Sequence, residues 1–100
     1  MSMTLPVSVE AAYIRGVIYL KAKRADDAKT EFQAILDHPG IAPVSPPHSL
    51  ALLGLARAYA LEGDASKSRS AYQNFFARWM DADSDIPILQ QAKAEYAKLQ

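Results

Sequence analysis

The chain has 100 residues, half of them hydrophobic, which is enough for one small domain with its own core. Eleven basic and eleven acidic side chains cancel, so the charge gives no reason to expect binding to nucleic acid or to an anionic membrane. The absence of cysteine excludes disulfides, thiolate metal sites and cysteine nucleophiles, and it fits a cytoplasmic location. The apolar windows are also interrupted by Arg15, Lys21 or Arg57 before the roughly 18–20 residues that a membrane-spanning helix needs.

The first half of the chain predicts two helices. After a lead-in over residues 1–7, Ser8 is a candidate N-cap for a helix that reaches about Lys23. A second helix begins at Ala25 or Asp26 with acids in its first turn, where the helix dipole favours them, and ends before Pro39 and Gly40. The three prolines within residues 41–47 then predict an extended loop.

The second half predicts three more helices. One runs from about Pro47 to Glu62, and Gly63 follows it as the residue best able to take the left-handed conformation after a helix end. Asp64 suits the N-cap of the next helix, which extends to about Met80. After the polar break 81–85, a last helix over residues 86–99 carries an apolar stripe that includes Ala92 and Tyr96. Five helices and no strand candidate predict an all-α fold.

The first four predicted helices form two hairpins, each made of two consecutive helices, and the second hairpin repeats the first at a spacing of 40 residues. Four pairs of positions match in kind: Gly16 with Ala56, Tyr19 with Tyr59, Ala28 with Ser68, and Phe32 with Tyr72. This order of small and aromatic residues resembles the tetratricopeptide repeat, whose unit has 34 residues. About six extra residues fall in the proline-rich loop. The resemblance departs from the usual pattern at Ala12, Arg15 and Pro39.

The resemblance implies a right-handed stack of two helix-turn-helix hairpins closed by a capping helix. On this interpretation, residues 8–45 form the first repeat with its loop, 46–85 the second repeat, and 86–100 the C-terminal capping helix of a single domain. The small residues of each hairpin allow its two helices to approach closely, and the aromatic residues fill the space between hairpins.

A narrower resemblance covers most of the chain. It rests on the runs Tyr13-Ile-Arg-Gly, Leu55-Ala-Arg-Ala-Tyr-Ala-Leu-Glu-Gly-Asp64 and Ala92-Lys-Ala-Glu-Tyr-Ala-Lys-Leu99, among others. These are similar to the C-terminal tetratricopeptide region of some bacterial serine/threonine protein kinases and related multidomain regulators. The implied chain is a module of a longer regulatory protein. It holds no glycine-rich phosphate loop and no His-Arg-Asp or Asp-Phe-Gly motif, so we expect no enzymatic activity in these residues.

The residues that suggest metal or catalytic chemistry are better explained as structural. Asp81, Asp83 and Asp85 are spaced like the start of a calcium loop, but Ile86 and Ala92 occupy the positions that need glycine and glutamate. The two histidines, His38 and His48, have no third metal ligand at a suitable spacing. We therefore expect no catalytic residue, metal or cofactor.

The predicted functional surface is the groove lined by the first helix of each hairpin. Nine residues fall at groove positions: Tyr13, Val17, Leu20, Lys21, Leu50, Leu53, Gly54, Arg57 and Leu61. Lys21 and Arg57 are expected to orient an acidic side chain or a terminal carboxylate, and Gly54 to let a ligand backbone come close. In the alternative, most of these residues bury one another or the last helix, and Arg57 pairs with an acid such as Glu62 or Glu95.

Two functions follow from this surface. The first is non-catalytic binding of a protein or peptide, without nucleic acid or membrane. The second is self-assembly, as a homodimer or larger packing element that orders neighbouring domains. Because no helix is predicted ahead of the first hairpin, Tyr13, Ile14 and Ile18 are expected to leave apolar surface open.

Overall fold

The computed structural model describes residues 9–37, 46–78 and 87–99, and every regular element within these ranges is an α-helix. The prediction of an all-α fold with five helices is therefore confirmed for the described residues. The predicted cap Ser8 and the polar break 81–85 lie outside them. The elements are α1 (Val9–Lys21), α2 (Ala25–Leu36), α3 (Pro46–Leu61), α4 (Ala65–Arg78) and α5 (Pro87–Ala97).

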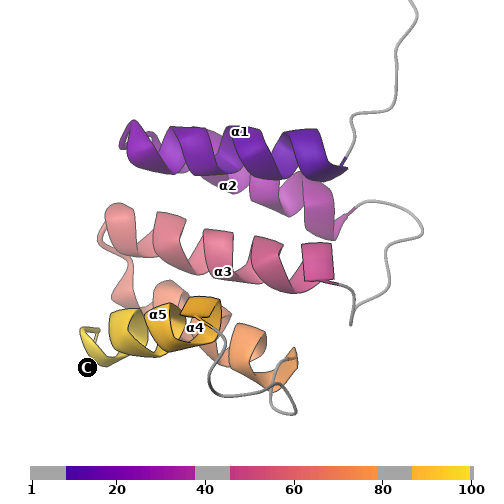
Figure 1. Ribbon diagram of the computed structural model, residues 1–100. Helices are drawn as coiled ribbons and strands as arrows, with labels where there is room; N and C mark the ends of the chain where they lie inside the picture. Colours follow the sequence, from indigo (N-terminus) through magenta and orange to yellow (C-terminus); the bar gives the residue numbers. More distant parts are fainter. Residues whose placement is uncertain (1–8, 38–45, 79–86, 100) are drawn as a thin grey trace, which may run out of the picture.

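The helices form a stack with α3 in the middle. The helices α1 and α2 lie together at one end, and α4 and α5 lie at the other (Figure 1). The second helix, α2, packs against both α1 and α3, while α4 packs against α3 and α5. The central helix is consequently the most enclosed, and residues 51–56 are all buried.

The turns of the two hairpins have the same backbone hydrogen bonds, displaced by 40 residues. In the first turn, Arg24 N–H donates to Tyr19 O (2.8 Å) and Lys23 N–H to Leu20 O (3.1 Å). In the second turn, the equivalent bonds join Asp64 to Tyr59 (2.9 Å) and Gly63 to Ala60 (3.1 Å). This pair of bonds is the Schellman motif, which satisfies the last carbonyls of a helix. The 40-residue spacing seen in the sequence thus has a counterpart in the backbone.

The residue inside each turn takes a left-handed conformation. Gly63 has φ 87°, as the sequence predicts, and Lys23 has φ 63° at the equivalent position. This conformation is the reason that α1 ends at Lys21, two residues before the predicted end. The predicted N-cap is confirmed, because Asp64 Oδ1 accepts a hydrogen bond from Lys67 N–H (3.1 Å). Its counterpart Arg24 makes no side-chain cap.

Phe32 joins the first three helices. Its side chain is fully buried, and its ring lies against two glycines, Gly16 of α1 and Gly54 of α3. A Cβ atom added at Gly16 would come within 2.6 Å of the ring, and one added at Gly54 within 2.5 Å. Tyr13 packs edge-on to the same ring, with centroids 6.0 Å apart. Gly54 is therefore explained by packing within the molecule, and the expectation that it admits a ligand backbone is wrong.

Equivalent positions in the second hairpin are filled differently. Ser68 takes the place of Ala28, and both are fully buried. The Ser68 hydroxyl donates a hydrogen bond of 2.7 Å to the carbonyl oxygen of Ala56, which satisfies its polar group inside the core. The small residues that the repeat predicts therefore lie at the contact between α3 and α4.

The last helix packs on the second hairpin through a mixed apolar and polar contact. Leu89 and Ala92 are buried. The Tyr96 ring lies edge-on to Phe76, with centroids 5.6 Å apart, and its hydroxyl accepts a hydrogen bond of 3.0 Å from Gln73 Nε2. This arrangement agrees with the role predicted for the apolar stripe of the C-terminal helix, which is to cover α4.

The Phe32 contact makes both glycines intolerant of a methyl group. We predict that Gly16→Ala or Gly54→Ala lowers the free energy of unfolding by about 1–3 kcal/mol, because the ring must shift within a packed core. A loss of stability would indicate the contact with Phe32, since glycine-to-alanine changes in a helix otherwise stabilise by about 1 kcal/mol. Urea titration measures both. Phe32→Leu should reduce the cost of Gly16→Ala in a double-mutant cycle, and additive effects would contradict the contact.

The two left-handed residues offer a matched pair of substitutions. Lys23→Gly should stabilise the protein by about 1 kcal/mol, because a side chain at positive φ is strained. Gly63→Lys should destabilise it by a similar amount, although no atom lies within 4 Å of the position a Cβ would take. Thermal unfolding of both variants tests the effect. Changes of the same sign would contradict the equivalence of the two turns.

Candidate protein-binding surface

The nine predicted groove residues lie on α1 and α3 but differ in exposure. Leu53 and Gly54 are buried in the core, and Lys21 is exposed. The other six are half-buried: Tyr13, Val17, Leu20, Leu50, Arg57 and Leu61. The structure therefore leaves part of each of these six accessible and removes two of the nine from any surface.

Two of the predicted groove residues border one hollow. Tyr13 of α1 and Leu50 of α3 line it with Val9, Glu10 and Ile14, and its volume is about 250 Å³. Four of the five lining side chains are hydrophobic or aromatic, and Glu10 supplies the charge. Small apolar hollows with a single polar group are typical of sites that accept one hydrophobic side chain of a partner.

The outer face of α1 carries exposed isoleucines. Ile14 and Ile18 are each 57% exposed, and they are the large hydrophobic residues that stand out as exposed among the described residues. They lie one helical turn apart, so together they form one apolar patch. The expectation that the start of the first hairpin leaves apolar surface open is confirmed for these two residues.

The predicted cation of the groove is already bound within the chain. Arg57 Nε donates to Glu95 Oε1 at 2.8 Å, and Arg57 Nη2 donates to Glu95 Oε2 at 3.0 Å. The Tyr72 hydroxyl donates a third bond to Glu95 Oε1 at 2.7 Å. Of the two alternatives for Arg57, the structure contains the ion pair with Glu95, which joins α3 to α5. The hydrogen bond from Tyr72 joins α4 to the same carboxylate.

Burial shapes the charges of this cluster. Burial raises the pKa of the Tyr72 phenol well above its ordinary value, and the hydrogen bond to Glu95 raises it further. For Arg57, burial lowers the pKa, but the hydrogen bonds and charge of Glu95 outweigh that effect, so the pKa is raised. The phenol therefore stays protonated and the guanidinium stays charged at neutral pH.

Comparisons with known proteins do not assign the chain to a family. No family model, curated protein or solved structure matches it. The likeness to tetratricopeptide repeats consequently remains a prediction that rests on the residues themselves.

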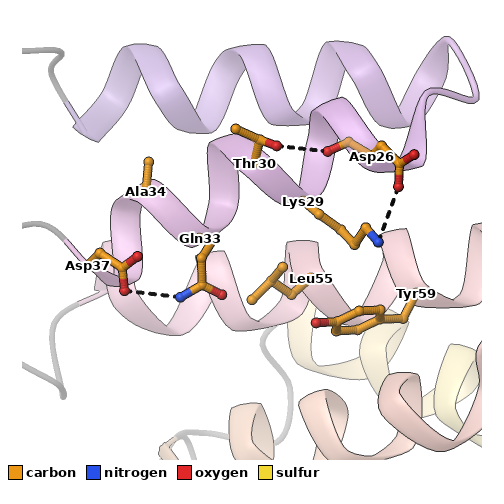
Figure 2. Close-up of a pocket in the computed structure, with 8 residues that line it drawn as sticks. All are labelled: Asp26, Lys29, Thr30, Gln33, Ala34, Asp37, Leu55 and Tyr59. Carbon is orange, nitrogen blue, oxygen red and sulfur yellow. Dashed lines mark hydrogen bonds and ion pairs between the residues drawn. The ribbon is translucent and has the colours of Figure 1, made fainter.

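A second hollow, of about 660 Å³, lies between α2 and α3 (Figure 2). Polar side chains of α2 and its C-cap form one side, and Leu55 and Tyr59 of α3 form the other (Figure 2). The residues that line it are Asp26, Lys29, Thr30, Gln33, Ala34, Asp37, Leu55 and Tyr59. None of these belongs to the predicted groove, so sequence analysis missed this hollow.

The charges in the second hollow are largely paired. Lys29 Nζ lies 2.9 Å from both Glu62 oxygens and 3.2 Å from Asp26 Oδ1. It also lies 5.5 Å from the centre of the Tyr59 ring, while Gln33 Nε2 donates to Asp37 at 3.1 Å. The hydrogen bond to Glu62 raises the pKa of Lys29. The three-residue spacing of Asp26 and Lys29 along α2 is a signal in the sequence for their ion pair. The contact of Lys29 with Glu62 depends on the tertiary structure.

The described residues contain no group of three or more metal-ligating side chains. His48 lies in the first turn of α3, where burial and the charge of Arg78 lower its pKa. His38 and the acidic run Asp81, Asp83 and Asp85 lie outside the described residues. Within the described ranges, no helix is long and apolar enough to cross a membrane.

The raised pKa of Tyr72 predicts a loss of stability at alkaline pH. The folded state holds the phenolic proton more tightly than the unfolded state, so the stabilisation is complete below the ordinary pKa of 10.0 and falls as the pH rises above it. Between pH 10 and 12, the free energy of unfolding of the parent protein should fall more steeply with pH than that of Tyr72→Phe. The difference between the two slopes should reach up to about 1.4 kcal/mol per pH unit. Urea titration at pH 7 measures the lost hydrogen bond separately. Equal alkaline slopes in both proteins would contradict the prediction.

Proposed function

We propose that this domain is a non-catalytic module that binds a protein or peptide on the face shared by α1 and α3. The observation that carries the proposal is the apolar hollow between Tyr13 and Leu50, because two predicted groove residues from different helices meet there beside solvent. A hydrophobic side chain of the partner would enter the hollow. Lys21, exposed at the end of α1, would attract an acidic group of the same partner.

Within this proposal the roles of the two cations differ from the expectation. The guanidinium of Arg57 forms a bidentate ion pair with Glu95, so its role is to hold the C-terminal helix against the stack. Lys21 forms no ion pair with another described residue, so it is the cation available to a ligand.

The domain would be a tetratricopeptide-like stack of two hairpins, right-handed and closed by α5. The repeated turn bonds and the buried small residues Ala28 and Ser68 support this interpretation. On the same resemblance, the chain would belong to a longer cytoplasmic regulatory protein of bacteria, such as a serine/threonine kinase, and would bring that protein to its partner.

Self-assembly is the second candidate function. The exposure of Ile14 and Ile18 favours it, because contiguous apolar side chains on a surface are a feature of protein–protein contacts. In this case the domain would order its neighbours by pairing with another copy.

Selection from a phage library of random peptides tests the groove. Enriched peptides should bind the parent protein in fluorescence anisotropy, and Leu50→Gln should weaken that binding about 10-fold by making the hollow polar. Leu36→Gln is the matched control, because Leu36 is also half-buried but lies at the end of α2, outside the groove. Circular dichroism checks that both variants fold. Equal binding by the two variants, or no enriched peptide, would reject the groove.

A further inference from the structure

The outer face of α1 carries a stripe of four exposed side chains with an ordered pattern of charge. Glu10 stands at one end, Ile14 and Ile18 in the middle, and Lys21 at the other end. At 100° per residue these four positions fall within roughly 80° of arc, so they share one face of the helix. Neither Glu10 nor Lys21 forms an ion pair with another described residue.

The same face of the equivalent helix is a packing surface inside the molecule. At the 40-residue spacing, Ile14 and Ile18 correspond to Gly54 and Ala58 of α3, and both of these are buried. Gly54 receives the Phe32 ring of α2. On α3 this face therefore accepts a neighbouring helix, α2, and on α1 the described residues leave it open.

The order of the charges selects the partner. In an antiparallel pair of α1 helices, residues whose numbers add up to about 32 lie opposite each other. Ile14 of one copy then meets Ile18 of the other, and Glu10 meets Lys21. A two-fold axis repeats each contact, so one arrangement satisfies every member of the stripe. A parallel pair would place like charges together at both ends.

We propose that two copies of this chain associate through this stripe, with their α1 helices antiparallel. The proposal rests on the self-assembly function given above. Glu10 and Ile14 belong both to this stripe and to the lining of the hollow, so a second copy and a peptide in the hollow would compete for α1. The four isoleucines supply the burial, and the two Glu10–Lys21 contacts set the direction of the pairing. Because only one helix of each copy takes part, the interface is small and the dimer is weak and reversible.

Sedimentation over a range of protein concentrations tests the interface. The parent chain should form a dimer, and Ile14→Glu should raise its dissociation constant at least about 10-fold by placing two like charges in the apolar centre. The matched control is Ala94→Glu, which adds the same charge at an exposed position of α5 and should leave the dimer unchanged. Because both positions are exposed, neither change is expected to unfold the domain.

Charge exchange tests the direction. Glu10→Lys and Lys21→Glu should each weaken self-association, by about 10-fold at low salt, because each places like charges opposite each other. The mixture of these two variants should form a heterodimer, since each positive stripe then faces a negative one. The double variant Glu10→Lys with Lys21→Glu should dimerise like the parent.

The possible failures have different meanings. A chain that stays monomeric at all concentrations overturns both the self-assembly function and this interface. A dimer that survives Ile14→Glu overturns the interface and leaves self-assembly standing. A dimer that needs Ile14 but ignores the charge variants overturns the antiparallel arrangement.

Discussion

The fold depends on one aromatic ring held between two glycines. Phe32 projects from α2 and touches Gly16 of α1 and Gly54 of α3, so a single side chain sets the distances among three helices. Close packing explains why: protein interiors leave little free volume, and a ring fits there only where both neighbours lack a Cβ atom. The glycines would each weaken a helix in isolation, by about 1 kcal/mol, and the packing of the ring compensates for that weakness.

The other end of the stack is held by a polar contact of similar importance. Glu95 of α5 accepts two hydrogen bonds from Arg57 and one from Tyr72, so α3, α4 and α5 meet at one carboxylate. Breaking such a partly buried network costs more than an exposed ion pair contributes, because the remaining charge loses its partner. The position of the C-terminal helix is therefore fixed in two ways. Leu89 and Ala92 are buried against the stack, and the directional hydrogen bonds of Glu95 set how the helix is oriented.

The two ends of the stack differ in what they leave open. At the C-terminal end, α5 covers the apolar face of the second hairpin, and Arg57 is paired with Glu95 of α5. At the other end, α1 keeps the apolar hollow beside Tyr13 and the exposed Ile14 and Ile18, and Ile14 also lines the hollow. Both proposed functions therefore concern α1, the helix that borders the hollow and carries the exposed isoleucines.

The sequence by itself determined the five helices, the repeat of 40 residues, Gly63 after a helix end and Asp64 as a cap, because these depend on neighbours within one or two turns. It also predicted the open apolar surface at Ile14 and Ile18. Only the tertiary structure decided that Lys23 takes the strained turn conformation, that Gly54 accommodates Phe32, and that Glu95 is the partner of Arg57. The last two contacts join residues more than 20 positions apart, and no local pattern sets the distance between side chains on different helices.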